Sequence, residues 1–153
     1  MVEFKLTGMD RAIERMRKLP ADLRKKPGRS ALGKAARVIT KAAKANALRV
    51  DDRETGRQIA QNVVQRFRSR YFRATGDLMV SVGVVTERGR IPKGNPDTGA
   101  KGNTPHWHLL ELGTEEMAAQ PFLRPAMEQN MTAAIATFGN ALSRQLEKLG
   151  ADP

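Results

Sequence analysis

The chain has 153 residues and a mass of 16.9 kDa, the size of one ordinary domain, which argues against an enzyme with separate cofactor and substrate modules. It contains no Cys, so disulfides, thiolate nucleophiles and cysteine-bound zinc or iron–sulfur sites are excluded. No stretch approaches the roughly 18 apolar residues of a membrane span, and the first residues lack the layout of a signal peptide, so we expect neither.

The charge of the chain is strongly positive and unevenly distributed. There are 27 Lys and Arg against 16 Asp and Glu, a net charge of +11. Residues 1–50 hold 14 basic and 4 acidic side chains, residues 51–100 hold 9 and 6, and residues 101–153 hold 4 and 6. Nearly all of the excess positive charge therefore belongs to the first third.

The first third predicts a strand and two helices. Alternating apolar residues predict a strand over 2–6, and Met9, Ile13 and Met16 recur at helical spacing until Pro20 ends a helix over 9–19. After a connector from Pro20 to Pro27, Ser30 can cap a second helix. One face of this helix is apolar and another carries a basic stripe of Lys34, Arg37, Lys41 and Lys44.

The middle third predicts a helix, a strand and a long loop. Ile59, Val63, Phe67 and Tyr71 are spaced by four, which predicts a third helix within residues 51–75. Residues 78–85 are rich in β-branched side chains, and Val80, Val82 and Val84 share one face of the predicted strand. Residues 86–104 are rich in Gly and charge, so we expect an extended loop or hairpin arm.

The last third predicts a short element and a long helix. Residues 105–117 are aromatic and aliphatic, typical of a strand or short helix, and Pro121 is expected to open a helix that ends before Gly150. The whole chain is then one α+β domain, 1–153, with a small antiparallel sheet packed against three to four helices.

His106, Trp107 and His108 are the first candidates for a metal site. On a strand, the two imidazoles would project from one face, and Glu111 is the nearest further ligand. Glu111 falls on the opposite strand face from His108, so the ligand set is incomplete. We prefer a His pair that flanks a buried or interfacial Trp, and we predict no metal and no cofactor.

Catalytic motifs are missing from the sequence as well. Glu111, Glu115 and Glu116 have no Ser near them, and no nucleophile-elbow, zinc-protease or P-loop motif is present. We therefore predict no catalytic residues and a protein that is not an enzyme.

The basic stripe and the arginines around Phe67, Tyr71 and Phe72 suit phosphate contact with base stacking, so a nucleic-acid-binding module is physically plausible. A solvated helix face, or a face that docks onto an acidic subunit, would have the same pattern. Charge alone does not separate these interpretations.

The segment Trp107 to Thr114, followed by Ala119 to Met127, is long and unusual. It resembles the signature of the tail-completion or head–tail joining neck proteins of tailed bacteriophages of the HK-ninety-seven type, in which Glu-x-Gly-Thr leads into Gln-Pro-Phe-Leu-Arg-Pro-Ala. The motif residues, which we expect to be structural or at an interface, are Trp107, Glu111, Gly113, Thr114, Gln120, Pro121, Phe122, Arg124 and Pro125. Relative to shorter members, residues 51–75 are an additional helical segment and 86–104 a long loop.

The motif also has a local structural interpretation. Gly113 permits a chain reversal, Thr114 can hydrogen-bond the turn backbone, and Pro121 presets the first residue of a helix. Glu111 and Arg124 are the charged members, and they are expected to pair with each other or across a subunit boundary.

The resemblance implies a structural virion protein that acts at the head–tail interface within a homo-oligomeric ring. Its partners would be other copies of itself and the neighbouring neck and tail-tube proteins, with assembly in the host cytoplasm and no membrane contact. Residues 86–104 would reach onto the next subunit. The basic helices would face an acidic partner ring or DNA, and the alternative function is a small basic nucleic-acid-binding protein.

Overall fold

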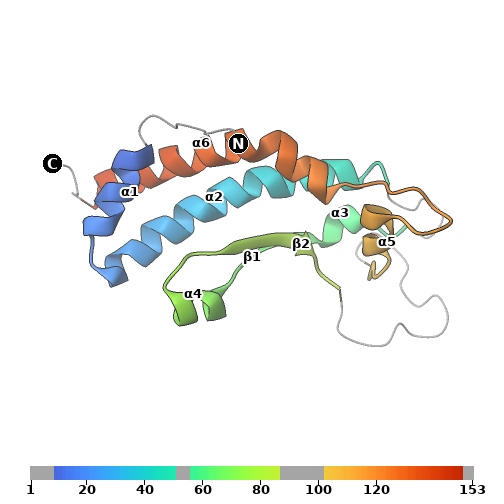
Figure 1. Ribbon diagram of the computed structural model, residues 1–153, viewed down its shortest axis with the longest axis horizontal. Coiled ribbons are helices and arrows are strands. Elements are labelled where there is room, and N and C mark those ends of the chain that lie inside the picture. Colours follow the sequence, from blue (N-terminus) through green and yellow to red (C-terminus); the bar gives the residue numbers. More distant parts are fainter. Residues whose placement is uncertain (1–8, 51–55, 87–101, 150–153) are drawn as a thin grey trace. The chain divides into compact units, whose positions relative to one another are not determined.

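The computed structural model describes residues 9–50, 56–86 and 102–149, and it confirms the α+β class (Figure 1). The predicted strand 2–6 and residues 87–101 of the predicted arm lie outside these ranges. The described elements, in chain order, are α1 (Met9–Lys18), α2 (Ala21–Ala47), α3 (Ile59–Asn62), β1 (Val63–Phe67), α4 (Ser69–Thr75), β2 (Val80–Val84), α5 (Trp107–Leu112) and α6 (Leu123–Lys148).

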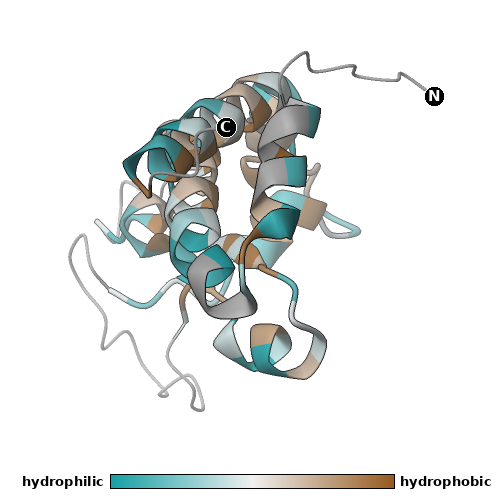
Figure 2. Ribbon diagram, turned by 90° about the vertical axis from the view of Figure 1, so that its left-hand side faces the viewer, coloured by the Kyte–Doolittle hydropathy of each residue, from teal (hydrophilic) through white to brown (hydrophobic). Residues whose placement is uncertain are grey.

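The chain divides into two compact units, and both long helices contribute to each of them. The first unit comprises residues 1–38, 66–81 and 132–153, and its buried cluster is Ala31, Ala141, Leu142 and Leu146. The second comprises residues 39–65 and 82–131, with a buried cluster of Ala43, Ala47, Ile59, Ala60, Val63, Phe122 and Ala126. Hydrophobic and hydrophilic residues alternate along the helices, as expected of amphipathic helices (Figure 2).

The sheet has two antiparallel strands, β1 and β2. The N–H of Val85 donates to the carbonyl of Asn62, and the N–H of Arg68 donates to that of Met79, so the strands are paired from both ends. This register confirms the predicted strand around Val80–Val84. Val82 and Val84 share one face, as predicted, and pack against the buried cluster of the second unit.

Helix α2 begins at Ala21, so the predicted connector from Pro20 to Pro27 is wrong. Pro27 lies inside the helix, where it has no N–H to donate to the carbonyl of Leu23. Pro27 and Gly28 are nevertheless buried, and a side chain at Gly28 would meet Leu78 and Met16. Tertiary packing of this face therefore outweighs the poor helix propensity of the Pro-Gly pair.

The single third helix predicted from the spacing of Ile59, Val63, Phe67 and Tyr71 is also wrong. The segment forms a four-residue helix, then β1, then α4. A spacing of four is an even number, so residues four apart share a face on a strand as well as on a helix. The β-branched pair at the start of β1 favours the strand, and pairing with β2 selects it.

Residues 105–117 contain a helix, α5, rather than the strand that was the other expectation. The chain enters it through Thr104, which is fully buried and accepts a hydrogen bond from Asn62 Nδ2 at 2.9 Å. The same amide nitrogen donates to the carbonyl of Gly102 at 2.9 Å. The final helix begins at Leu123, two residues after Pro121, so the prediction that Pro121 opens it is wrong.

Candidate functional site

The carboxylate of Glu111 lies within the motif from Trp107 to Met127 and holds the start of the last helix. Glu111 is on α5 and only 8% exposed. The N–H groups of Phe122 and Leu123 donate to its Oε2 at 2.8 and 2.9 Å, and the N–H of Arg124 donates to its Oε1 at 2.9 Å. A side chain from another helix therefore caps α6, where a negative charge is also favoured by the helix dipole.

The cap satisfies every donor that the start of α6 leaves open. The first four N–H groups of a helix, counted from the cap residue, have no partner within the helix. With Phe122 as the cap residue, Glu111 accepts from the first three, and the fourth position is Pro125, which has no N–H. The Phe-Leu-Arg-Pro order of the motif thus leaves three N–H donors, and one carboxylate accepts all three.

The turn between α5 and α6 is built by Gly113 and Thr114. Gly113 has a φ of +78°, and a Cβ there would lie 2.9 Å from the backbone nitrogen of Ala119. The hydroxyl of Thr114 accepts hydrogen bonds from the N–H groups of Glu116 and Met117, at 3.3 and 3.0 Å. The reversal predicted at Gly113 is confirmed, although a helix and not a strand precedes it.

Two aromatic residues of the motif anchor this turn in the second unit. Phe122 is fully buried, and Trp107, the first residue of α5, packs partly buried against the same cluster. Asn46 Nδ2 on α2 donates to the carbonyl of Phe122 at 3.2 Å. The motif is therefore tied to α2 by both apolar packing and a hydrogen bond.

The remaining motif residues lie at the surface. Gln120, Pro121 and Pro125 line a hollow of about 220 Å³ together with residues at the end of α2, among them Arg49. Glu111 contacts Arg124 through the Arg124 backbone N–H and not through the expected pairing of charged side chains, and the Arg124 side chain is exposed. These residues are accessible to a partner.

His106 and His108 do not have the strand geometry on which the metal hypothesis depended. His106 immediately precedes α5 and His108 lies in its first turn, where residues two apart point in different directions. Nδ1 of His108 lies 2.8 Å from the carbonyl oxygen of Pro105. Among the described residues, no three His, Asp or Glu side chains are grouped so as to hold a metal ion.

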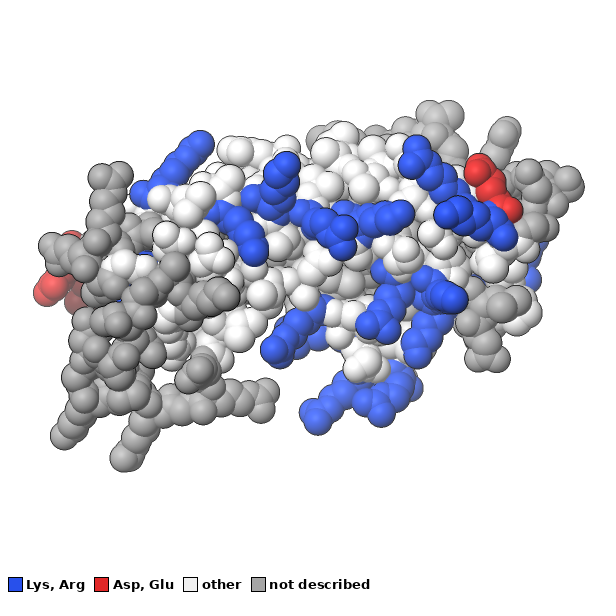
Figure 3. Space-filling model, turned by 180° about the vertical axis from the view of Figure 1, so that it is seen from behind, with Lys and Arg blue, Asp and Glu red and all other residues white. Residues whose placement is uncertain are grey.

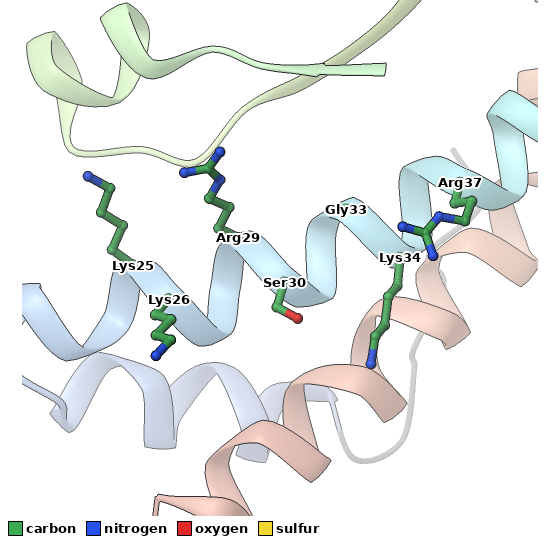
Figure 4. Close-up of a pocket in the computed structure, with 7 residues that line it drawn as sticks. All are labelled: Lys25, Lys26, Arg29, Ser30, Gly33, Lys34 and Arg37. Atoms are coloured by element: carbon green, nitrogen blue, oxygen red, sulfur yellow. The ribbon is translucent and has the colours of Figure 1, made fainter. Parts of the chain in front are cut away.

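A second feature, which we call the basic groove, lies on the N-terminal half of α2 (Figure 4). It has a volume of about 580 Å³. Five exposed cations line it together with two small residues, and no acidic or apolar side chain does: Lys25, Lys26, Arg29, Ser30, Gly33, Lys34 and Arg37.

Aromatic rings on β1 and α4 support two of these cations. The Arg29 guanidinium lies 4.5 Å from the centre of the Phe67 ring, and Lys25 Nζ lies 5.0 Å from that of Phe72. Phe67 and Phe72 contact each other, with ring centres 6.2 Å apart. Two of the rings predicted to stack on bases therefore hold two of the cations of the groove.

The structure divides the predicted basic stripe. Lys34 and Arg37 line the groove in the first unit, whereas Lys41 and Lys44 belong to the second unit. Lys25, Lys26 and Arg29 were not predicted to belong to this face, because Lys25 and Lys26 fall in the predicted connector and Arg29 precedes the predicted cap residue Ser30. Their spacing of one, three and four from one another would have indicated the same helix if Pro27 had been accepted inside it.

Nearly all of the excess positive charge belongs to the first unit. The sequence of the first unit contains 17 Lys and Arg against 7 Asp and Glu, a net charge of +10, and that of the second contains 10 against 9. Arg66, Arg68, Arg70 and Arg73 join the N-terminal cations in the first unit. The charged side chains on the face drawn in Figure 3 are mainly Lys and Arg, with few Asp and Glu.

Within the described ranges no helix is long and apolar enough to cross a membrane. No curated protein and no solved structure matches the chain. Residues 10–113, more than half of the chain, match the family described as "Bacteriophage HK97-gp10, putative tail-component", and the match ends at the turn glycine of the motif. The chain therefore belongs to the HK97-gp10-like family of bacteriophage tail components.

Proposed function

We propose that this tail component is a structural protein of the phage neck, which completes or joins the tail at the head–tail interface as part of a homo-oligomeric ring. The observation that carries the proposal is the family match over residues 10–113, which includes Glu111 and the turn glycine. The protein would act through surfaces in the virion, without catalysis, and would be assembled in the host cytoplasm.

Exposed apolar side chains around the motif support a subunit boundary there. Leu109 and Leu112 are exposed on α5, and Leu112 reaches 68% exposure. Met127 and Met131 are exposed one turn apart on α6. A head-to-tail ring would cover these side chains with the next copy or with a neighbouring neck or tail-tube protein.

Electron microscopy of particles made without the protein tests the position in the virion. Deletion of the gene from its phage should yield heads and tails that are not joined, and the wild-type gene should restore complete particles. Antibody labelling should mark the head–tail junction. Joined particles in the deletion strain, as a separate nucleic-acid-binding protein would give, or labelling along the tail tube, would overturn the proposal.

The ring is tested by complementation with Leu112→Asp. A charge in a covered interface is costly, so we expect at least tenfold fewer joined particles. Leu48→Asp is the matched control, because Leu48 is 58% exposed in the same unit but lies outside the motif. Cross-linked particles should release a closed multimer of the wild-type protein, and a single copy per particle would contradict the ring.

A further inference from the structure

We propose that the basic groove of α2 binds the phosphate backbone of double-stranded DNA without sequence preference. The groove is lined by five exposed cations, Ser30 and Gly33, and it lies in a unit of net charge +10. The evidence for DNA binding comes from the groove alone. It does not depend on where the protein lies in the virion.

The side chains of the groove suit phosphates along a strand. Lys26, Ser30, Lys34 and Arg37 follow one another at spacings of four, four and three, so they extend about 16 Å along the helix axis. One DNA strand rises about 3.4 Å per nucleotide along the duplex axis, so a row of this length is long enough to contact several phosphates of the backbone. Figure 4 shows Lys25 and Arg29 on one side of the helix and Lys26 and Lys34 on the other.

The base of the groove permits close approach. Gly33 has no side chain, and a Cβ built there would meet nothing within 4 Å, so the space above it is open. The Ser30 hydroxyl lies one turn earlier and is a common donor to phosphate oxygens. The Arg29 guanidinium is held on the face of Phe67, which leaves its edge, with its N–H donors, available for a phosphate.

The composition of the groove favours DNA over an acidic protein. The centres of protein–protein interfaces are depleted in Lys and enriched in aromatic and apolar side chains. Protein–DNA interfaces are much more positively charged and more polar. Three of the five cations here are Lys, and no apolar residue lines the groove.

Fluorescence anisotropy with a labelled duplex of about 30 base pairs tests the proposal with the full chain. For the wild type, log Kd should rise linearly with log salt concentration, with a slope of about 0.9 for each phosphate contacted. Because five cations line the groove, we expect four to five phosphate contacts. An absence of binding at about 50 mM salt would overturn the proposal.

The triple variant Lys26→Gln, Lys34→Gln and Arg37→Gln removes three exposed cations of the groove and leaves the apolar side chains of α5 and α6 unchanged. It should bind at least tenfold more weakly near 100 mM salt, with the slope reduced by about 2.7. The charge-matched control is Lys41→Gln, Lys44→Gln and Arg49→Gln, which changes the second unit by the same amount. Its slope should stay near the wild-type value, and equal losses in both variants would reject the groove as the site.

An acidic protein partner is distinguished by competition. Polyglutamate of the same total charge as the duplex should displace the DNA poorly, because its carboxylates do not repeat at the phosphate spacing. Displacement at equal charge concentration would overturn the proposal in favour of an acidic protein. Circular dichroism melting of each variant checks that the substitutions leave the fold intact.

Discussion

Replacement of Glu111 by Ala tests whether one carboxylate holds the start of α6. The substitution removes the acceptor of three backbone N–H groups. The N–H of Phe122 belongs to a fully buried residue, so leaving it unpaired costs about 1–3 kcal/mol. Loss of the helix cap at the other N–H groups costs about 1 kcal/mol more. This cost is smaller because Arg124 is exposed and water can replace the carboxylate there. We expect a loss of about 3 kcal/mol in the free energy of unfolding.

Urea denaturation monitored by Trp107 fluorescence measures this loss in the free energy of unfolding. Trp107 is the single Trp of the chain and lies on α5 with Glu111. The melting temperature should fall by about 6–12 °C for a chain of this size. Glu111→Gln keeps one acceptor oxygen and should lose roughly half as much free energy. Glu116→Ala, which removes an exposed carboxylate nearby, is the control. A Glu111→Ala loss below about 0.5 kcal/mol, or one equal to the control, would refute the reasoning.

For three further substitutions, the structure determines whether the protein is destabilised or stabilised. Gly113→Ala should destabilise by about 2–3 kcal/mol in thermal melts, since its φ is +78° and its Cβ would approach the backbone of Ala119; an unchanged melt would contradict the turn geometry. Gly33→Ala should instead stabilise by about 0.5–1 kcal/mol, because it adds helix propensity in open space; a loss would show that the space is occupied. Phe122→Ala should cost about 3–5 kcal/mol in urea titrations through a core cavity, and a cost under 1 kcal/mol would disprove its burial.

Several elements follow from local pattern alone. The helix that ends before Pro20 and the strand with Val82 and Val84 on one face both agree with the prediction, because an apolar stripe of clear period packs, partly buried, against a core cluster in each. The segment around Val63 and Phe67 differs from the prediction, because a spacing of four fits both a helix and a strand. At Pro27 the prediction is wrong for a different reason. Proline disfavours a helix locally, but the burial of this residue in α2 outweighs that preference.

The sequence by itself determined the α+β class, the uneven charge and the family resemblance in the segment from Trp107 onward. These are properties of neighbouring residues, so they can be read without a fold. Only the tertiary structure decided what Glu111 does, because its three hydrogen-bond donors follow it by 11 to 13 positions and meet it only through the turn at Gly113. It also decided which cations form the groove, since the rings of Phe67 and Phe72 reach Arg29 and Lys25 from elements far along the chain.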